Sequence, residues 1–440
     1  MATRKSAFKP VQAVSVNLWG LDVGAVALDP DTGFYAFEYE PKFVQTGIEL
    51  SPLHMPLADA NAPFVFPTLP VNTYQRLPAM LADALPDRFG NALINAWMAE
   101  RGIAQTNVTA LDRLAYMGRR SMGGLTFKPS RGPQSAAATA VQMSQLVAEA
   151  RAVVNGDFVD SDHAGDLLRQ IIQVGTSAGG ARAKATIAWN RHTQDVRTGQ
   201  FEIPAGYEAW LLKFDGIGLD HQLGPGKNYG RIEYAYSLMA RAAGVSMSDC
   251  SLLEEGGRAH FMTQRFDRDD NRRHHMQTLC GMAHLDFNQQ ESHSYHQLFQ
   301  TLRQLQLDAP SFAQTLRRMV FNVLAANNDD HTKNFSFLLK QGGQWELAPA
   351  YDVTYAYDPD NIWLRQHLMS VNGKFSRITR EDIRHVANAY GLLGVCNAIV
   401  EESQAAIARW PEFAEKAGLP RAVRDQIALT HKEMAAYLGG

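Results

Sequence analysis

The sequence has few cysteines, no long apolar run and no strong excess of charge. Its three cysteines, Cys250, Cys280 and Cys396, lie far apart and form no CxxC pair, so we expect no disulfide framework, no zinc site and a reducing, cytoplasmic setting. No apolar run approaches the roughly 18 residues of a membrane span, and the first residues, MATRKSAFKPVQAVSV, lack an apolar core and a cleavage signal. We therefore expect neither a transmembrane helix nor a signal peptide. A net charge of −3 gives no indication that the surface as a whole binds nucleic acid or membrane.

What is present is an ordinary globular composition. The 440 residues are 45% hydrophobic, which is enough for two or three domains with real cores. Apolar and polar residues alternate from Val14 to Leu18, and this period of two predicts a strand. Apolar residues recur every four positions from Leu81 to Leu93, which predicts a helix that Pro86 interrupts.

The stretch PSRGPQSAAATA, residues 129–140, is rich in Pro, Ser, Gly and Ala and is the best candidate for a linker. A small α/β unit precedes it, a strand-rich region follows over residues 171–266, and helical patterns dominate from Tyr295 onward. This order is typical of two-lobed kinases, but also of many other α+β proteins. The predicted divisions are an N-terminal subdomain at 1–130, a strand-rich lobe at 131–265 and a helical lobe at 266–440.

The first candidate site is NNDDHTKNFSF, residues 327–337, which directly follows an apolar helix. Asp329 and Asn334 are five residues apart, as are the Asp and Asn of the protein-kinase catalytic loop. There the Asp orients the attacking hydroxyl and accepts its proton, and the Asn oxygen holds a magnesium ion that bridges the phosphates. Lys333 and His331 add donors for the transferring phosphoryl group. Taken alone, the segment also fits a solvated loop whose Asp and Asn form turns.

A second candidate carboxylate is Asp352 in LAPAYDVTYAY, 18 residues after Asn334. Phosphoryl transfer needs a further magnesium ligand, and kinases place theirs downstream of the catalytic loop. Val353 and Thr354 stand where the usual DFG motif has Phe and Gly. An aspartate in a turn at the end of a strand is the alternative reading.

A third segment, GTSAGGARAKATIAW, contains a glycine turn. Gly179 and Gly180 would let backbone N–H groups approach phosphate oxygens, and Lys184 would add a cation. The segment matches neither a Walker A motif nor GxGxxG. A plain hairpin turn therefore stays open as an alternative.

Two further segments complete a possible nucleotide site. Lys213 stands inside the apolar strand EAWLLKFDG, where a lysine is costly unless it is paired or faces solvent. In kinases such a lysine binds the ATP phosphates, and Glu233 in the next helix is the natural partner. Gln264, Arg265 and Phe266 lie where a kinase hinge would hydrogen-bond adenine through its backbone. An outward strand position for Lys213, a solvated helix position for Glu233 and a strand edge for the hinge remain the alternatives.

The glycine turn, strand lysine, helix glutamate, hinge, Asp-to-Asn loop and second aspartate follow one another in kinase order. In these motifs the chain resembles the HipA serine/threonine kinases of bacterial toxin–antitoxin systems. The resemblance covers nearly the whole chain. It rests on LADALPDRFGNALI and RLAYMGRRSMGGLTF in the N-terminal part, and on GGARAK, LLKF, QRFDR, LCGMAHLDF, DDHTKNFSF and AYDVTYAY in the C-terminal part.

The resemblance implies an α+β, protein-kinase-like two-lobed fold, distantly similar to phosphoinositide kinases, with an N-terminal α/β subdomain fused to the first lobe. It assigns the catalytic role to Asp329 and magnesium binding to Asn334 and Asp352. Lys213 would bind the ATP phosphates, and Gln264 to Phe266 would hold adenine. The cofactors implied are ATP and Mg²⁺.

The resemblance also implies regulation and partners. Ser177 matches the family's autophosphorylated serine, although Thr176 beside it leaves the modified residue open, and GGARAK stands where the family often has AGAQEK. Asp330 stands where many relatives have a small residue; the spacing to Asn334 favours Asp329 as the base. The family acts in persistence with a HipB-like DNA-binding antitoxin and phosphorylates a protein such as an aminoacyl-tRNA synthetase. We expect DNA contact to come through such an antitoxin, because this chain shows no helix-turn-helix.

Two other functions remain open from the residues. The DxHxxN pattern from Asp329 to Asn334 also suits small-molecule and lipid kinases, although GRRSMGG favours the toxin family. A non-catalytic repressor subunit or pseudokinase is the third possibility. The full set of Lys213, Asp329, Asn334 and Asp352 argues against lost catalysis.

Overall fold

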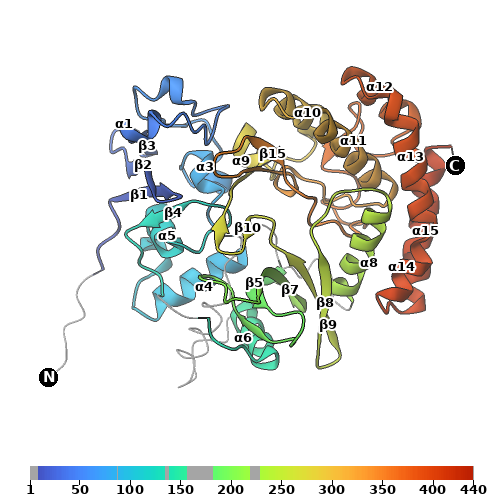
Figure 1. The fold of residues 1–440 in the computed structure, drawn as a ribbon, viewed down its shortest axis with the longest axis horizontal. Coiled ribbons are helices and arrows are strands. Elements are labelled where there is room, and N and C mark those ends of the chain that lie inside the picture. The colour runs from blue at the N-terminus through green and yellow to red at the C-terminus, as the bar shows by residue number, and fades with distance from the viewer. Residues whose placement is uncertain (1–7, 87, 134–137, 156–181, 219–227, 440) are drawn as a thin grey trace. The chain divides into compact units, whose positions relative to one another are not determined.

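A computed structural model describes residues 8–86, 88–133, 138–155, 182–218 and 228–439 (Figure 1). The chain divides into two compact units. Unit 1 comprises Met1–Trp210, Ile217–Leu219 and Asp267–His275, and unit 2 comprises Leu211–Gly216, Asp220–Phe266 and Met276–Gly440. The three predicted domains, 1–130, 131–265 and 266–440, stay a prediction.

Unit 1 contains a four-stranded antiparallel sheet in the order β3-β2-β1-β4. Its strands are β1 (Ala13–Leu18), β2 (Leu21–Leu28), β3 (Tyr35–Tyr39) and β4 (Thr126–Lys128). Val14 and Val16 are fully buried while Ser15 between them is exposed. The predicted strand is thus confirmed, and one face of β1 packs on the core, although the polar Asn17 is buried as well.

The helices of unit 1 follow the predicted interruption at Pro86. They are α1 (Pro41–Val44), α2 (Val71–Tyr74), α3 (Ala79–Ala82), α4 (Arg88–Ala99), α5 (Ala110–Met117) and α6 (Met143–Asn155), with short 3₁₀ turns at Leu57–Asp59 and Gln105–Asn107. The chain leaves α3 before Pro86 and enters α4 after it, since proline cannot donate a helical hydrogen bond. Leu81 and Leu93, at the two ends of the four-residue pattern, are both fully buried.

Unit 1 contains further strands among its described residues. They are β5 (Arg182–Trp189), β6 (Val196–Thr198), β10 (Arg268–Asp269) and β11 (Arg272–Arg273). β5 and β6 pair antiparallel, with Ile187 opposite Thr198. Lys184 lies inside β5.

Unit 2 holds the strands β8 (Cys250–Glu255), β9 (Arg258–Gln264), β12 (His275–Thr278), β13 (His293–Ser294), β14 (Ser336–Leu339), β15 (Trp345–Leu347) and β16 (Met369–Ser370). Residues Leu211–Gly216 of β7 (Glu208–Gly218) also belong to it. β9 lies between β7 and β8, and β14 lies between β12 and β15. The first of these groups positions Lys213, and the second carries the chain out of the predicted catalytic loop.

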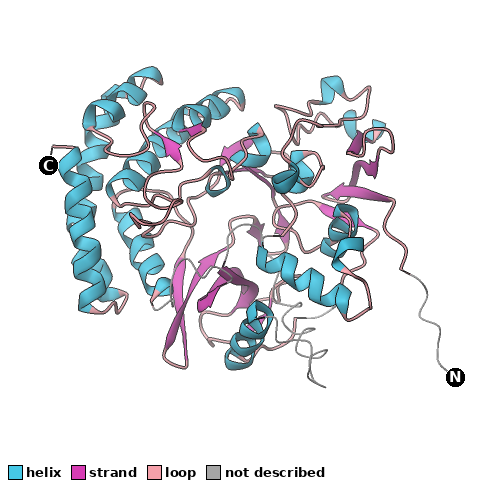
Figure 2. Ribbon diagram, turned by 180° about the vertical axis from the view of Figure 1, so that it is seen from behind, coloured by secondary structure: helices cyan, strands magenta, loops and turns pink. Residues whose placement is uncertain are grey.

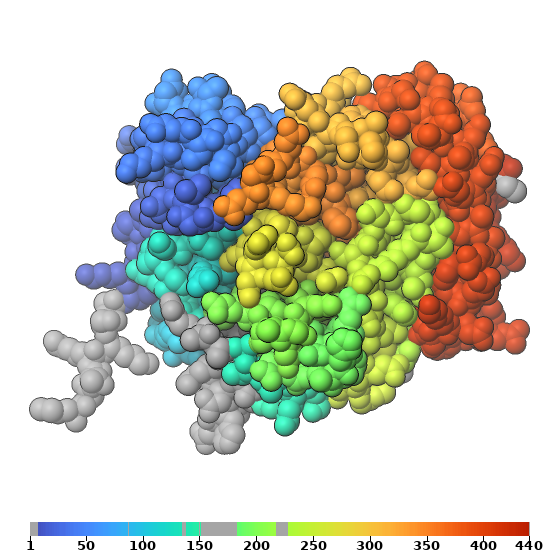
Figure 3. All heavy atoms as spheres, viewed as in Figure 1, coloured from blue at the N-terminus to red at the C-terminus, as the bar shows by residue number. Residues whose placement is uncertain are grey.

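Helices make up most of the rest of unit 2, as the pattern after Tyr295 predicted (Figure 2). They are α8 (Tyr229–Ala242), α9 (Leu279–Ala283), α10 (Tyr295–Gln304), α11 (Ala309–Leu324), α12 (Arg380–Ala389), α13 (Leu393–Ala408), α14 (Trp410–Lys416) and α15 (Arg421–Tyr437). Ser294 and Thr379 start α10 and α12 with capping boxes, which satisfy N–H groups that a helix start leaves open. The C-terminal helices form a continuous surface, red in Figure 3. No helix among the described residues is both long enough and apolar enough to cross a membrane.

A buried histidine joins three of these helices. His431 on α15 lies 2.8 Å from the Tyr236 hydroxyl on α8, and its ring meets that of Trp410 edge-on. Tyr236 donates its hydroxyl proton to the Ala325 carbonyl at 2.7 Å, so the His431 Nε2–H is the donor to Tyr236. Burial lowers the pKa of His431 to about 4, which keeps the ring neutral.

This histidine predicts acid sensitivity of the helical unit. Because the pKa of His431 is about 4 in the folded chain and about 6.5 when unfolded, the unfolded state binds the extra proton. The free energy of unfolding should therefore fall by about 3 kcal/mol as pH falls from about 6.5 to about 4. Urea unfolding at a series of pH values measures this. A His431→Gln variant, which retains a donor for Tyr236, should show a smaller loss; an unchanged loss would contradict the assignment.

Candidate active site

The predicted catalytic loop begins where α11 ends. Helix α11 starts at its cap Asp308, which accepts the Ser311 N–H at 3.1 Å, and ends at Leu324. Ala326 then adopts a left-handed backbone with φ of +51°, an uncommon conformation for a residue other than glycine. Residues 327–331 follow as a loop, and a 3₁₀ turn at Thr332–Asn334 leads into β14. The polar residues after the buried helix therefore form a defined loop between two buried elements.

The two neighbouring aspartates of this loop have different surroundings. The Asp329 side chain is 47% exposed, whereas that of Asp330 is fully buried. Asp330 accepts four hydrogen bonds: from the Tyr295 hydroxyl at 2.8 Å, from the Leu368 N–H at 2.8 Å, from the Met369 N–H at 3.4 Å, and from His367 Nδ1 at 3.0 Å in the tautomer that donates. A carboxylate occupied in this way cannot reach a substrate hydroxyl. The geometry thus favours Asp329 over Asp330 as the base, in agreement with the spacing to Asn334.

A buried polar chain extends from Asp330 into α10 and α11. Asn322 donates to the Tyr295 hydroxyl at 3.0 Å, and Asn327 donates to the Asn322 side-chain oxygen at 3.0 Å. Burial beside Asp330 raises the pKa of Tyr295 well above its usual value, so Tyr295 remains a hydroxyl donor. Connected buried networks of this kind fix one arrangement of a loop, because each unpaired member would be costly.

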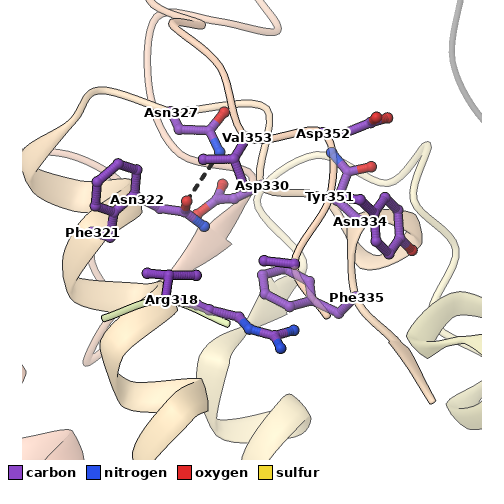
Figure 4. A pocket seen from close by; sticks show the side chains of 12 residues that line it. Arg318, Phe321, Asn322, Asn327, Asp330, Asn334, Phe335, Tyr351, Asp352 and Val353 are labelled. Atoms are coloured by element: carbon purple, nitrogen blue, oxygen red, sulfur yellow. Dashed lines mark hydrogen bonds between the residues drawn. The ribbon is translucent and has the colours of Figure 1, made fainter. Parts of the chain in front are cut away.

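Asn334 is anchored to the same loop. Its side-chain N–H donates to the Asp329 backbone carbonyl at 2.7 Å. This bond leaves the Asn334 side-chain oxygen as the atom that can face a cation. Asn334 and Asp352 both line one small pocket, with free volume of about 10 Å³, which is roughly the space of one water molecule (Figure 4).

Asp352 is presented by a strained and cross-linked segment. Its backbone is left-handed, with φ of +53°, a conformation that costs free energy and often marks functional sites. The neighbouring Tyr351 hydroxyl donates to the Lys333 carbonyl at 2.6 Å and lies 2.5 Å from the Ser336 hydroxyl. Tyr351 thus ties the Asp352 segment directly to the turn that carries Asn334.

The two candidate ligands fit magnesium by their chemistry. Mg²⁺ takes hard oxygen ligands, is held by one or two protein groups, and completes its shell with water and substrate phosphates. The Asn334 amide oxygen and the Asp352 carboxylate provide such a pair. In the described part of the chain no group of three or more His, Cys, Asp or Glu side chains could form an all-protein metal cage.

Lys213 places a buried ammonium beside Asp352. It is buried in β7, and its ammonium lies 2.5 Å from Glu233 on α8 and also contacts Asp352. Burial opposes its charge, but Asp352 and Glu233 together outweigh this and raise the pKa of Lys213. The predicted Lys213–Glu233 pair is confirmed. The alternative of a solvent-facing strand lysine is wrong, because Lys213 is only 7% exposed.

His331 and Lys333 extend from the loop to a common aromatic residue. The Lys333 ammonium lies 4.6 Å from the centre of the Phe287 ring, and the His331 ring lies 5.4 Å from it. His331 Nε2 also lies 3.9 Å from the Asp329 carboxylate. Phe287 therefore contacts both side chains beside the loop, and their assigned roles stay a prediction.

The predicted hinge lies at the end of β9. The Gln264 N–H donates to the Asp249 carbonyl at 2.8 Å, and the Phe266 ring lies 5.6 Å from that of Tyr351. Arg265 is 5% exposed. The tilted contact of Phe266 with Tyr351 connects the hinge to the segment that presents Asp352, and adenine binding stays a prediction.

The next residues of QRFDR have a structural role in unit 1. Asp267 is fully buried and accepts the Gly123 N–H at 2.7 Å, while Arg268 donates to the Gly123 carbonyl at 3.1 Å. Arg273 donates to the carbonyls of Arg119 at 2.6 Å and Gly123 at 2.9 Å. The motifs GRRSMGG and QRFDR, some 145 residues apart, thus bind each other. The two motifs therefore have a shared structural role, because each holds the other in place, in addition to any role of QRFDR at the hinge.

The remaining candidates fall outside this group. Gly179, Gly180, Ser177 and its neighbour Thr176 lie outside the described residues. Lys184 belongs to unit 1 and is buried at 3% exposure in β5. Its phosphate-binding role stays a prediction.

Several residues that hold the site had no signal in the sequence. Tyr295 and His367 lie 35 and 37 residues from Asp330, and only the fold brings them to its carboxylate. Phe287 likewise precedes the loop by more than 40 residues. Tyr351 was visible inside AYDVTYAY, but its contact with Lys333 was not.

Comparisons with known proteins cover most of the chain. The model of the HipA N-terminal domain matches residues 14–128, and that of the HipA-like C-terminal domain matches residues 176–435. A chain from the complex of the Shewanella oneidensis MR-1 toxin–antitoxin proteins HipA and HipB with operator DNA superposes with a TM-score of 0.67, at 17% identity and over 96% of both chains. The predicted α+β fold of the HipA type is therefore confirmed.

Two further likenesses each cover about half of this chain. A Sinorhizobium fredii protein named "Putative kinase Y4dM" is 22% identical over 265 residues, which is 55% of this chain and 61% of that protein. The proinflammatory kinase CtkA of Helicobacter pylori superposes with a TM-score of 0.35 at 13% identity, over 54% of this chain and 90% of CtkA. The match to Y4dM thus leaves more than a third of that protein uncovered.

Proposed function

Because the chain belongs to the HipA family, we propose that it is an ATP- and magnesium-dependent serine/threonine-protein kinase and the toxin of a toxin–antitoxin pair. The observation that supports this most is the convergence within unit 2. Lys213 is paired with both Glu233 and Asp352, and Asp352 shares a pocket with Asn334 of the Asp329 loop. A buried lysine that joins a helix glutamate to a second aspartate is the arrangement that kinase phosphoryl transfer uses.

Each residue has a separate role in the proposed phosphoryl transfer. Bound Mg-ATP would supply the γ-phosphoryl group and the metal charge. The half-exposed Asp329 orients the substrate hydroxyl and accepts its proton as the oxygen bonds to phosphorus and ADP leaves. Asn334 and Asp352 hold the metal, and Lys213 binds phosphate oxygens. His331 and Lys333 offset charge on the transferring group.

The nucleotide and regulatory residues complete the proposal. Gln264, Arg265 and Phe266 hold adenine through their backbone, and Gly179, Gly180 and Lys184 approach the phosphates. Ser177, with Thr176 as the alternative, receives the autophosphorylation that switches the kinase off, because the added charge of about −1.5 to −2 draws on the same cations as ATP.

The partner assignment rests on family membership and on the HipA–HipB–DNA complex that the fold resembles. We propose that a HipB-like antitoxin binds this chain and carries the main DNA contact. The protein substrate is a translation component such as an aminoacyl-tRNA synthetase, and the kinase acts in the cytoplasm.

A Lys213→Met variant tests the proposal. Loss of a charge-assisted contact to phosphate, of about 1.5–3 kcal/mol, should weaken ATP binding by about 10- to 100-fold. Wild-type protein incubated with Mg-ATP should gain one phosphate within residues 176–177, located by mass spectrometry, and the variant should gain none. Fluorescent ATP binding and far-UV circular dichroism are measured together, because Glu233 loses its ammonium partner and the fold is weakened.

The proposal fails under one clear outcome. If wild-type protein with intact fold neither hydrolyses ATP nor transfers phosphate to itself or to any host protein, the kinase assignment is wrong. Transfer to lipids or metabolites alone, on a panel run in parallel, would assign a different kinase class.

A further inference from the structure

A second, larger cleft opens beside the catalytic loop in unit 2. Its volume is about 220 Å³, and it is lined by Asn328 of the loop, by the segments that follow Asp352, and by the end of α15. Among the described residues, none of those proposed for catalysis, metal binding or nucleotide binding lines it. The cleft is therefore a separate feature that the proposed function leaves unexplained.

The cleft lies close to the proposed base along the chain. Asn328, in its wall, directly precedes Asp329, so their Cα atoms are about 3.8 Å apart. Asn328 is also bonded to the opposite segment: its backbone N–H donates to Ala356 at 3.2 Å and its side chain donates to Leu364 at 2.9 Å. Since an extended peptide advances about 3.3 Å per residue, a chain whose hydroxyl meets Asp329 would reach the cleft within a few residues.

Two arginines give the cleft its charge. Arg365 and Arg377 are both exposed in its lining, and Glu433 is the single acidic residue among the described residues that line it. Among the described residues, no carboxylate lies within 4.0 Å of either guanidinium and no hydrogen bond occupies either one. Arg377 is held in a left-handed backbone, with φ of +49°, a conformation that costs free energy and often marks binding sites. The lining thus offers two guanidinium forks suited to a carboxylate or a phosphate.

The segments that carry the two arginines are linked to the catalytic loop by hydrogen bonds. The His367 N–H donates to the Phe375 carbonyl at 2.9 Å, which joins the two segments that carry Arg365 and Arg377. Asp330 in turn holds His367 and the Leu368 N–H. The buried Asp330 therefore fixes the cleft relative to Asp329, and such preorganisation lowers the entropic cost of binding.

We propose that this cleft binds an anionic side chain of the protein substrate, a few residues from the hydroxyl that receives the phosphate. Arg365 and Arg377 pair with a carboxylate or a phosphate, and the aromatic side chains of Tyr357 and Tyr437 flank it. This inference rests on the proposed kinase function and names its substrate class: serine or threonine in an acidic or phosphorylated segment.

A peptide library tests the inference. Serine-centred peptides in an alanine background carry one Asp, Glu, phosphoserine or Lys at each flanking position, and phosphate transfer is measured with wild-type protein. We expect selection of an anionic residue at one or two positions. The double variant Arg365→Ala/Arg377→Ala should raise the KM for the selected peptide about tenfold or more and leave the KM for ATP unchanged. Arg365→Glu/Arg377→Glu should turn the selection toward lysine.

Arg421→Ala is the matched control. Arg421 lies at the start of α15, the helix that carries Glu433 further along, and is 87% exposed in a pair with Asp425. The Arg421→Ala substitution removes one surface arginine that does not line the cleft, so the KM for the peptide should not change.

A peptide-binding assay tests the cleft independently of phosphate transfer. A fluorescein-labelled serine peptide flanked by aspartates is titrated with wild-type protein and with the double alanine variant. Equal affinity for both, or transfer without anionic selection, would overturn the docking site while leaving the kinase assignment intact. Weaker binding by the double variant in a protein that transfers no phosphate would support the cleft and sink the kinase function instead.

Discussion

An Asp329→Asn protein should lose phosphoryl transfer by about 10²- to 10⁴-fold, the usual contribution of a general base. The amide cannot accept the proton of the substrate hydroxyl, while the rest of the site is unchanged. Because the Asp329 side chain is 47% exposed and Asn334 bonds to its backbone carbonyl rather than its carboxylate, the loop should keep its conformation. Transfer is measured on the protein itself and on host proteins by quantitative mass spectrometry.

The control for this variant is nucleotide binding. ATP affinity should stay within about threefold of wild type, since Lys213, Asn334 and Asp352 remain in place, and the melting temperature should hardly move. Wild-type rates of transfer from Asp329→Asn would place the base elsewhere. A joint loss of ATP binding and of fold would show instead that Asp329 is a structural residue.

The neighbouring Asp330→Asn change should have the opposite profile. Its carboxylate accepts bonds from Tyr295, His367 and the backbone of residues 368 and 369 inside a fully buried network. An amide places its own N–H group against these donors and removes the charge, at a cost of about 3 kcal/mol. The melting temperature should therefore fall by roughly 5 °C or more, as measured by differential scanning fluorimetry.

Activity then separates the two aspartates. In Asp330→Asn the residual transfer rate, measured well below the melting temperature, should fall less than in Asp329→Asn, because the base is still present. A stable Asp330→Asn protein without transfer would reverse the two roles and would contradict the burial argument.

The sequence locates the candidate residues of this loop, but only the tertiary structure distinguishes Asp329 from Asp330. The five-residue spacing located Asp329 and Asn334, because kinase chemistry fixes that distance along the chain. The sequence could not show which of the two aspartates is buried, because Asp329 and Asp330 are adjacent and identical in type. Their difference comes from Tyr295 and His367, which only the fold brings to one of them.

The paired motifs give a second example. GRRSMGG and QRFDR indicated the family, and the order of segments suggested a hinge at Gln264 to Phe266. The structure adds that Asp267, Arg268 and Arg273 bind the backbone of the first motif. Hydrogen bonds between segments 145 residues apart leave no periodicity or spacing in a single sequence, so no local pattern could have predicted them.

The sequence by itself determined the family, the α+β fold, the helical C-terminal part and the residues on which a kinase reading depends, because local periodicity and short motifs are written in consecutive residues. Tertiary structure alone decided which aspartate is buried, that Lys213 contacts Asp352 as well as Glu233, and that two arginines share a cleft beside the loop. Burial, ion pairing and cleft formation depend on segments that are distant in the chain, and their free energies exist only once those segments have met.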